Sequence, residues 1–182
     1  MRYGFIGLGN LGGALALNLR KADIALSVHD IDRANARPHE VAGATWVGSV
    51  AEMGSVCDAV ITCLPSPAVS ERVLADLLTT LKPGATWIEM STLGREPMLA
   101  LAQTAEAQGV RVLELPVTGG VHLAARGEIT LLAGGDTDLV ELHRPALDAL
   151  GGRLFHMGPV GSAALIKVIT NMLAFIHLVA DG

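Results

Sequence analysis

Short runs of apolar residues alternate along the chain with longer segments in which apolar residues recur every three or four positions. The short runs are typical of buried β-strands, and the longer segments are typical of amphipathic helices. The expected strands span residues 2–6, 24–30, 44–47, 58–65, 85–90, 110–116, 128–135 and 153–158. The expected helices span residues 10–21, 49–53, 68–81, 96–109, 136–151 and 162–182. This alternation predicts parallel βαβ units, and therefore an α/β fold with a doubly wound, mostly parallel sheet.

The last expected helix, residues 162–182, differs from the others because it is apolar on nearly every side. Its stretch from Val168 to Ala180 contains no Asp, Glu, Lys or Arg. A helix without a polar face needs partners around it, either from another subunit or from a further part of a longer protein. We therefore divide the chain into a sheet domain, residues 1–160, and the start of a long helix, residues 161–182. We expect this partner to be a second copy of the chain, so that a homo-oligomer forms through this helix.

Composition narrows the class of protein. Hydrophobic residues make up 51% of the chain and aromatic residues only 3%, which indicates an aliphatic core between helices and buried strands. The net charge of −5, with no cluster of Lys and Arg, disfavours nucleic acid and anionic membranes as partners. No apolar run is long enough to span a bilayer. Cys57 and Cys63 lack metal-site or redox spacing and indicate reduced thiols in a cytoplasmic protein, and the six scattered histidines suggest no metal site.

The first strand leads into a glycine cluster, Gly7-Leu8-Gly9-Asn10-Leu11-Gly12, which opens the first helix. Such G-x-G-x-x-G spacing is typical of a Rossmann-type dinucleotide site. There the first glycine permits the turn, the second admits a pyrophosphate, and the third lets the helix pack on the strand. Asp30 ends the second strand, where it would bind the adenosine ribose and repel a 2′-phosphate, which favours NAD over NADP. Arg33 and Arg37 could reach a phosphate, so NADP stays open. The alternative is a flexible glycine loop in which Asp30 caps a turn.

Motifs along the whole chain have the order found in one enzyme family. They are FIGLGNLGG (5–13), CLPSPA (63–68), EMSTLGREP (89–97), ELPVTGGVHLAARGEITLLAGG (114–135) and GPVGSAALIKVITNM (158–172). Together they resemble the β-hydroxyacid dehydrogenases, the group of 3-hydroxyisobutyrate dehydrogenase, tartronate semialdehyde reductase and, more distantly, 6-phosphogluconate dehydrogenase. The resemblance implies hydride transfer between a nicotinamide cofactor and a small 3-hydroxy acid of the 3-hydroxyisobutyrate or tartronate semialdehyde type.

The same resemblance implies roles for particular residues. Leu64, Pro65 and Thr92 would lie against the cofactor, and Lys167 would act as the general acid/base. The chemistry is reasonable, because burial in an apolar helix and a positively charged nicotinamide would both lower the pKa of a lysine toward neutrality. Asn171 lies at i+4 from Lys167, so both side chains face the same way and Asn171 can hold a substrate oxygen.

A donor-rich loop would complete the substrate site. Thr118, with the backbone N–H groups of Gly119 and Gly120, is suited to a carboxylate. Thr118 replaces the usual Ser of the family, which keeps the hydroxyl but adds a methyl group, and Glu114 replaces the usual Asp, a milder change. Thr170 replaces the usual Asn or His next to the catalytic pair, and this change leaves the substrate's identity open.

Length is the largest departure from the family. In the family, the helix that begins near Gly161 continues into an all-helical C-terminal domain, which closes the active site and which these 182 residues do not include. Two other functions therefore stay open: an imine reductase-like enzyme, against which Lys167 argues, and a non-catalytic NAD(P)-binding module. We interpret His29, His122 and His156 as structural, although His122 lies close to the substrate loop.

Overall fold

The computed structural model describes residues 1–180, apart from the side chain of Leu178. The strands are β1 (Tyr3–Ile6), β2 (Leu26–His29), β3 (Thr45–Trp46), β4 (Ala59–Thr62), β5 (Thr86–Glu89), β6 (Arg111–Glu114), β7 (Val117–Thr118), β8 (Thr130–Gly134) and β9 (Arg153–Gly158). The helices are α1 (Asn10–Lys21), the 3-10 helix η1 (Arg33–Ala36), α2 (Arg37–Val41), α3 (Val50–Val56), α4 (Pro67–Leu78), α5 (Arg95–Glu106), α6 (Val121–Ala125), α7 (Thr137–Leu142), α8 (Arg144–Leu150) and α9 (Ser162–Ala180).

The strands form one sheet in the order β3-β2-β1-β4-β5-β6-β8-β7, with β9 paired to β8. The strands from β3 through β6 are parallel, whereas β8 is antiparallel to β6 and β7. The chain moves outward in one direction from β1 to β3 and then in the other from β4 to β6. This arrangement confirms the predicted α/β fold with a doubly wound, mostly parallel sheet.

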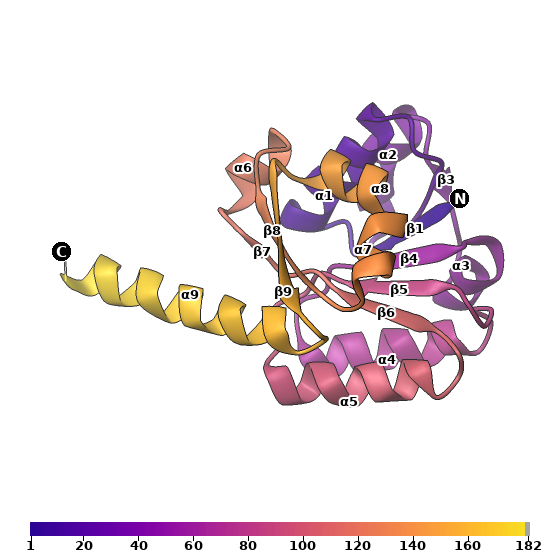
Figure 1. Ribbon diagram of the computed structural model, residues 1–182. Helices are drawn as coiled ribbons and strands as arrows, with labels where there is room; N and C mark the ends of the chain where they lie inside the picture. The colour runs from indigo at the N-terminus through magenta and orange to yellow at the C-terminus, as the bar shows by residue number, and fades with distance from the viewer. Residues whose placement is uncertain (181–182) are drawn as a thin grey trace.

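Two apolar clusters cover the two faces of the sheet. Alternate strand residues point to opposite sides, so Ile61 and Ile88 join the cluster under α1 and α8, whereas Val60 and Trp87 join the one under α3, α4 and α5. Figure 1 shows α4 and α5 on one face and α1 and α8 on the other. Burial of both faces explains why the central strands read as continuous apolar runs rather than as alternating patterns.

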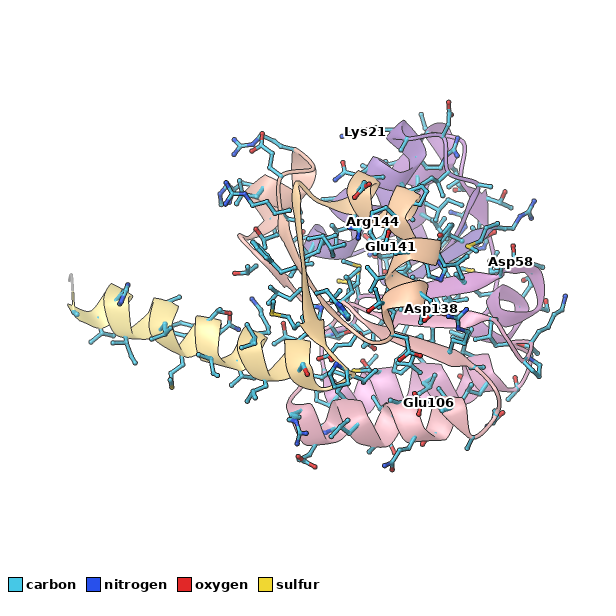
Figure 2. The ribbon with its side chains drawn as sticks, in the orientation of Figure 1. Lys21, Asp58, Glu106, Asp138, Glu141 and Arg144 are labelled. Atoms are coloured by element: carbon cyan, nitrogen blue, oxygen red, sulfur yellow. The ribbon has the colours of Figure 1, made fainter. Side chains whose placement is uncertain are left out.

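The predicted C-terminal helix is present as α9, which begins directly after β9 and extends away from the sheet. Its first turns pack against β8, β9 and α5. Farther along the helix, Phe175 is 67% exposed and Val179 is 80% exposed. The side chains of this outer part project without neighbours from the rest of the described chain (Figure 2).

The prediction of a single helix over residues 136–151 is wrong. The chain forms two helices there, α7 and α8, with His143 between them at φ −96° and ψ 3°. Pro145 lies in the first turn of α8, because proline lacks an N–H group and its ring clashes with a preceding helical turn. Glu141 and Arg144, labelled in Figure 2, form an ion pair across the break. The apolar pattern also did not predict η1, α2, β7 or α6, all of which are short.

Candidate functional site

The candidate site begins at the carboxyl ends of β1 and β4, where the order of the parallel strands reverses. Ligands of open α/β sheets bind at such a switch point, because loops from neighbouring strands diverge there and leave a crevice. A cavity of about 460 Å³ lies at this edge. It is lined by Gly7, Gly9, Asn10, Leu11, Gly12, Cys63, Leu64, Pro65, Met90, Ser91 and Thr92. The fold thus brings together three segments, the glycine turn and the loops after β4 and β5, that lie far apart in sequence.

The three glycines of the turn differ in the space that a Cβ atom would find. Gly7 has a φ of +96°, and a Cβ there would overlap with the carbonyl oxygen of Cys63. A Cβ on Gly12 would overlap with the carbonyl oxygen of Gly7, so α1 packs tightly against the end of β1. Gly9 has ordinary dihedral angles, and no heavy atom lies within 4 Å of a Cβ built on it. The open space beside Gly9 is therefore the place where a ligand can approach the backbone.

The start of α1 is suited to an anion. Gly9 is the N-cap, no side chain caps the helix, and the first turn contains no acidic residue. The N–H groups of the first turn have no partner within the helix, and the helix dipole makes this end positive. The opening beside Gly9 and the uncapped N–H groups therefore fit a pyrophosphate.

Asp30 lies just after β2, and its side chain contacts the glycine turn. One carboxylate oxygen accepts a hydrogen bond from Leu8 N–H at 2.6 Å, and the other accepts from Asp32 N–H at 2.8 Å and from Asn35 Nδ2 at 3.2 Å. A carboxylate has further lone pairs to offer a ligand hydroxyl. Leu8 itself is buried and contributes its backbone rather than its side chain.

A second cavity, of about 490 Å³, extends the first toward Asp30. The two cavities share Gly7, Leu64 and Pro65. The lining of the second cavity includes Arg72, a cation that the sequence analysis did not single out because nothing near it in sequence marks a site. An elongated ligand can therefore extend from Asp30 past the glycine turn to Thr92.

A buried hydrogen-bond network supports the floor of the first cavity. Leu64 N–H donates to Ser91 Oγ at 2.8 Å, Ser91 N–H donates to Glu89 Oε1 at 2.6 Å, and Thr62 Oγ1 donates to Glu89 Oε2 at 3.0 Å. Burial raises the pKa of Glu89, while these hydrogen bonds act in the opposite direction. Burial, and to a lesser degree the charge of Glu89, raises the pKa of Cys63 to about 12, so this thiol stays neutral. The network holds the loops after β4 and β5 in fixed positions.

Lys167 and Asn171 lie on α9, and neither residue lines either cavity. Lys167 is only 8% exposed, and burial lowers the pKa of its amine. No ion pair involving this amine occurs within residues 1–180. Asn171 is half-buried one turn farther along. Thr170 Oγ1 donates to the carbonyl of Lys167 at 2.9 Å and thus stays within its own helix.

The predicted substrate loop forms a tight turn after β7. Gly119 and Gly120 are exposed and have φ values of +128° and +81°, which favour glycine. Thr118 is half-buried and pairs with Thr130 of β8. Neither cavity at the switch point is lined by this loop or by Lys167. The described chain therefore gathers the predicted cofactor residues around these two cavities but leaves the Thr118 loop and Lys167 outside their lining.

The three histidines that we interpreted as structural lie outside the lining of both cavities or contact a backbone carbonyl. His29 Nδ1 lies 2.9 Å from the carbonyl of Val47, and His156 Nε2 lies 2.7 Å from the carbonyl of Gly135. His122 is exposed next to Gly120. In the described part of the chain, no three His, Cys, Asp or Glu side chains are arranged to hold a metal ion. Over residues 1–180, no helix has the length and apolarity needed to cross a bilayer.

The geometry at the switch point defines a class of protein, the Rossmann-type NAD(P)-binding domains, and comparisons with known proteins give the family. Residues 2–158 match the family model for the NAD binding domain of 6-phosphogluconate dehydrogenase. NAD-dependent L-serine dehydrogenase of Pseudomonas aeruginosa is 34% identical over 181 residues, which are 98% of this chain and 61% of that enzyme. This chain therefore belongs to the β-hydroxyacid dehydrogenase family and corresponds to its N-terminal, NAD(P)-binding domain, as the motifs predicted.

Solved structures agree with this assignment. The structure of 3-hydroxyisobutyrate dehydrogenase from Mycobacterium tuberculosis with L-serine has a TM-score of 0.95 and 30% identity, over 99% of this chain and 62% of that one. An imine reductase from Myxococcus stipitatus in complex with NADP⁺ has a TM-score of 0.93 over 100% of this chain and 63% of that one, but at 21% identity this likeness shows the fold alone. The chain spans less than two thirds of the length of each of these relatives.

Proposed function

We propose that this chain is the cofactor-binding part of an NAD-dependent dehydrogenase that acts on a small 3-hydroxy acid of the 3-hydroxyisobutyrate or tartronate semialdehyde type. The observation that carries the proposal is the side chain of Lys167, which is only 8% exposed, on a helix that begins just after the nucleotide-binding sheet. Burying a charged lysine is costly, and a lowered pKa is what a general base near neutral pH requires.

Cofactor binding is the first task of these residues. The N–H groups at the start of α1 would hold the pyrophosphate beside Gly9, and Asp30 would accept hydrogen bonds from the adenosine ribose hydroxyls. The Asp30 carboxylate would repel a 2′-phosphate, which favours NAD over NADP. Leu64, Pro65 and Thr92 would line the nicotinamide end of the same cavity.

Proton transfer is the second task. When bound, the nicotinamide supplies a hydride acceptor for alcohol oxidation or a hydride donor for the reverse reaction. The neutral amine of Lys167 would take the hydroxyl proton during oxidation, and its ammonium form would return a proton during reduction. Asn171 would hold a substrate oxygen, and Thr118, Gly119 and Gly120 would offer donors to the substrate carboxylate.

A non-catalytic NAD(P)-binding module is the second candidate function. It is favoured by one observation, namely that Lys167, Asn171 and the Thr118 loop do not share a cavity with the glycine turn in the described chain. An enzyme of this kind would need further protein to close its substrate site. The imine reductase-like alternative has no comparable support, and Lys167 argues against it.

Self-association and location stay predictions. The exposed apolar side chains of α9 favour a homo-oligomer through this helix, because apolar surface of this kind associates in water. Sedimentation at increasing protein concentration tests this, and a monomer at every concentration would contradict it.

A cytoplasmic location is the expectation from the two free cysteines.

The first experiment is a titration of the chain with NADH and NADPH, followed by nicotinamide fluorescence. Binding of NADH with weaker binding of NADPH supports the glycine cradle and the role of Asp30. Stronger binding of NADPH would overturn the argument from Asp30, and binding of neither would contradict the proposed function.

A further inference from the structure

Arg33, one of the two cations that the sequence places near the ribose site, is held by two contacts. Its Nη1 and Nη2 atoms lie 2.7 Å and 2.8 Å from the two carboxylate oxygens of Glu40. Its guanidinium carbon also lies 4.4 Å from the centre of the Trp46 ring. A bidentate pair and a cation–π contact together fix the orientation of a planar guanidinium more firmly than either one alone.

These contacts place Arg33 over the edge of the sheet beyond β2. Trp46 belongs to β3, pairs with Val28 of β2, and stacks on His29 with 5.3 Å between ring centres. Asp30 follows His29 directly, and its carboxylate accepts from Asp32 N–H at 2.8 Å. Arg33 therefore lies one short turn from the carboxylate that would face the adenosine ribose, but its two terminal nitrogens are engaged elsewhere.

We propose that Glu40 is a cofactor-specificity residue, which keeps Arg33 from serving a 2′-phosphate and so adds to the preference for NAD. The inference rests on the proposed function, because it assumes that the adenosine ribose lies at Asp30. In Rossmann domains, an arginine near the end of the second strand accommodates the 2′-phosphate of NADP. Glu40 binds both terminal nitrogens of the Arg33 guanidinium, which such a phosphate would need, and adds a second negative charge close to the place of that phosphate.

The expected effect is modest, because the pair is partly exposed. The side chains of Arg33 and Glu40 are 54% and 33% exposed. A surface ion pair of this kind is worth up to about 1 kcal/mol, which corresponds to about a fivefold change in an equilibrium constant. Glu40 would therefore tune the preference, while the Asp30 carboxylate remains its main source.

The test compares dissociation constants for NADPH and NADH, measured at one fixed low salt concentration, in variants of this chain. Glu40→Gln keeps the size of the side chain and removes its charge. Glu128→Gln is the matched control, since Glu128 is another exposed glutamate, with one oxygen 2.9 Å from Nε of Arg126, in a part of the chain away from β2. The double variant Arg33→Gln/Glu40→Gln shows whether a gain depends on the freed guanidinium.

The proposal expects Glu40→Gln to strengthen NADPH binding about fivefold, to leave NADH binding unchanged, and to lose this gain in the double variant. It is overturned if NADPH binding does not change, if Glu128→Gln gives an equal gain, or if the gain survives without Arg33. Those results leave the proposed function intact when the unmodified chain binds NADH. An unmodified chain that binds neither nucleotide would overturn the proposed function and this inference together.

Discussion

The carboxylate of Glu114, at the last position of β6, accepts a hydrogen bond of 2.6 Å from the backbone N–H of Gly161, just before α9. It also accepts one from the N–H of Ala164 in the first turn of that helix. On the other side, Gly134 of β8 lies so close that a Cβ there would overlap with Oε2 of Glu114. One buried carboxylate thus joins two strands to the start of α9, and the position of Lys167 depends on this junction.

Replacing Glu114 should therefore destabilise the chain. Glu114→Ala leaves the N–H groups of Gly161 and Ala164 without this acceptor, and we expect the free energy of unfolding to fall by about 2–4 kcal/mol. Glu114→Gln keeps one acceptor oxygen and should cost less. Urea unfolding followed by circular dichroism measures both losses. Replacement of the exposed Glu128 by Ala is the control and should change the free energy of unfolding by no more than about 0.5 kcal/mol. An equally small loss for Glu114→Ala would contradict the proposed role of Glu114 as the acceptor at the start of α9.

The glycine turn offers a pair of substitutions with opposite signatures. Gly9→Ala places its Cβ in open space at a φ of −63°, so the thermal unfolding temperature should barely change. NADH affinity should nevertheless fall at least about tenfold, because the methyl group occupies the space beside the helix N-terminus where we place the pyrophosphate. Nicotinamide fluorescence and thermal denaturation of the same sample measure both effects.

Gly12→Ala should instead affect the fold. Its Cβ would overlap with the carbonyl oxygen of Gly7, and relieving such an overlap typically costs about 1–3 kcal/mol. Both its unfolding temperature and its NADH affinity should therefore fall.

Unchanged NADH binding in Gly9→Ala would show that the open space beside Gly9 is not where the cofactor lies.

The sequence predicts this turn well because its chemistry is local. A strand, a glycine spacing and a helix are contiguous, and Asp30 follows at the end of the next strand, so neighbouring residues determine the geometry. The hydrogen bonds from the start of α9 to Glu114 could not be predicted in this way. Glu114 and Gly161 are 47 residues apart, and nothing in the pattern around either residue indicates that they meet. The buried position of Glu89 depends in the same way on the pairing of β4 with β5.

Local signals also compete with one another. Residues 136–151 have a helical apolar pattern, and Pro145 within them permits either a kink or a new helix start. The structure has a new start, because buried His143 ends α7 and makes two tertiary contacts. Its Nδ1 lies 2.8 Å from Tyr3 Oη, and its Nε2 lies 2.9 Å from Thr86 Oγ1. These contacts to β1 and β5 depend on the folded sheet and are invisible in the sequence.

The same buried histidine predicts a pH dependence of stability. Burial, and to a lesser degree the charge of Arg111, lowers the pKa of His143 to about 4. The unfolded chain binds a proton near pH 6.5, whereas the folded chain does so only near pH 4, so stability is lost as the pH falls through this interval. Between pH 7 and pH 5 the expected loss from this group is about 2 kcal/mol.

Urea unfolding at pH 7, 6 and 5 measures this loss. His143→Gln should be less stable at pH 7, because it disturbs the contacts to Tyr3 and Thr86, but its stability should change less with pH. The exposed His122→Gln is the control and should keep the pH dependence of the unmodified chain. Equal slopes for His143→Gln and the unmodified chain would show that another group causes the acid sensitivity.

Lys167 carries the proposed chemistry, and its removal separates binding from turnover. Lys167→Met keeps the length and apolar stem of the side chain and removes the amine. In an active form of the protein, the turnover number should fall by about 10²–10⁴, while NADH affinity stays within about twofold. Because burial lowers the pKa of the amine, oxidation by the unmodified enzyme should increase with pH through an apparent pKa below the ordinary lysine value, since the base must be neutral. Reduction should decrease over the same range. The exposed Lys82→Met should leave both profiles unchanged, and a Lys167→Met variant that still turns over normally would place the proton transfer on another group.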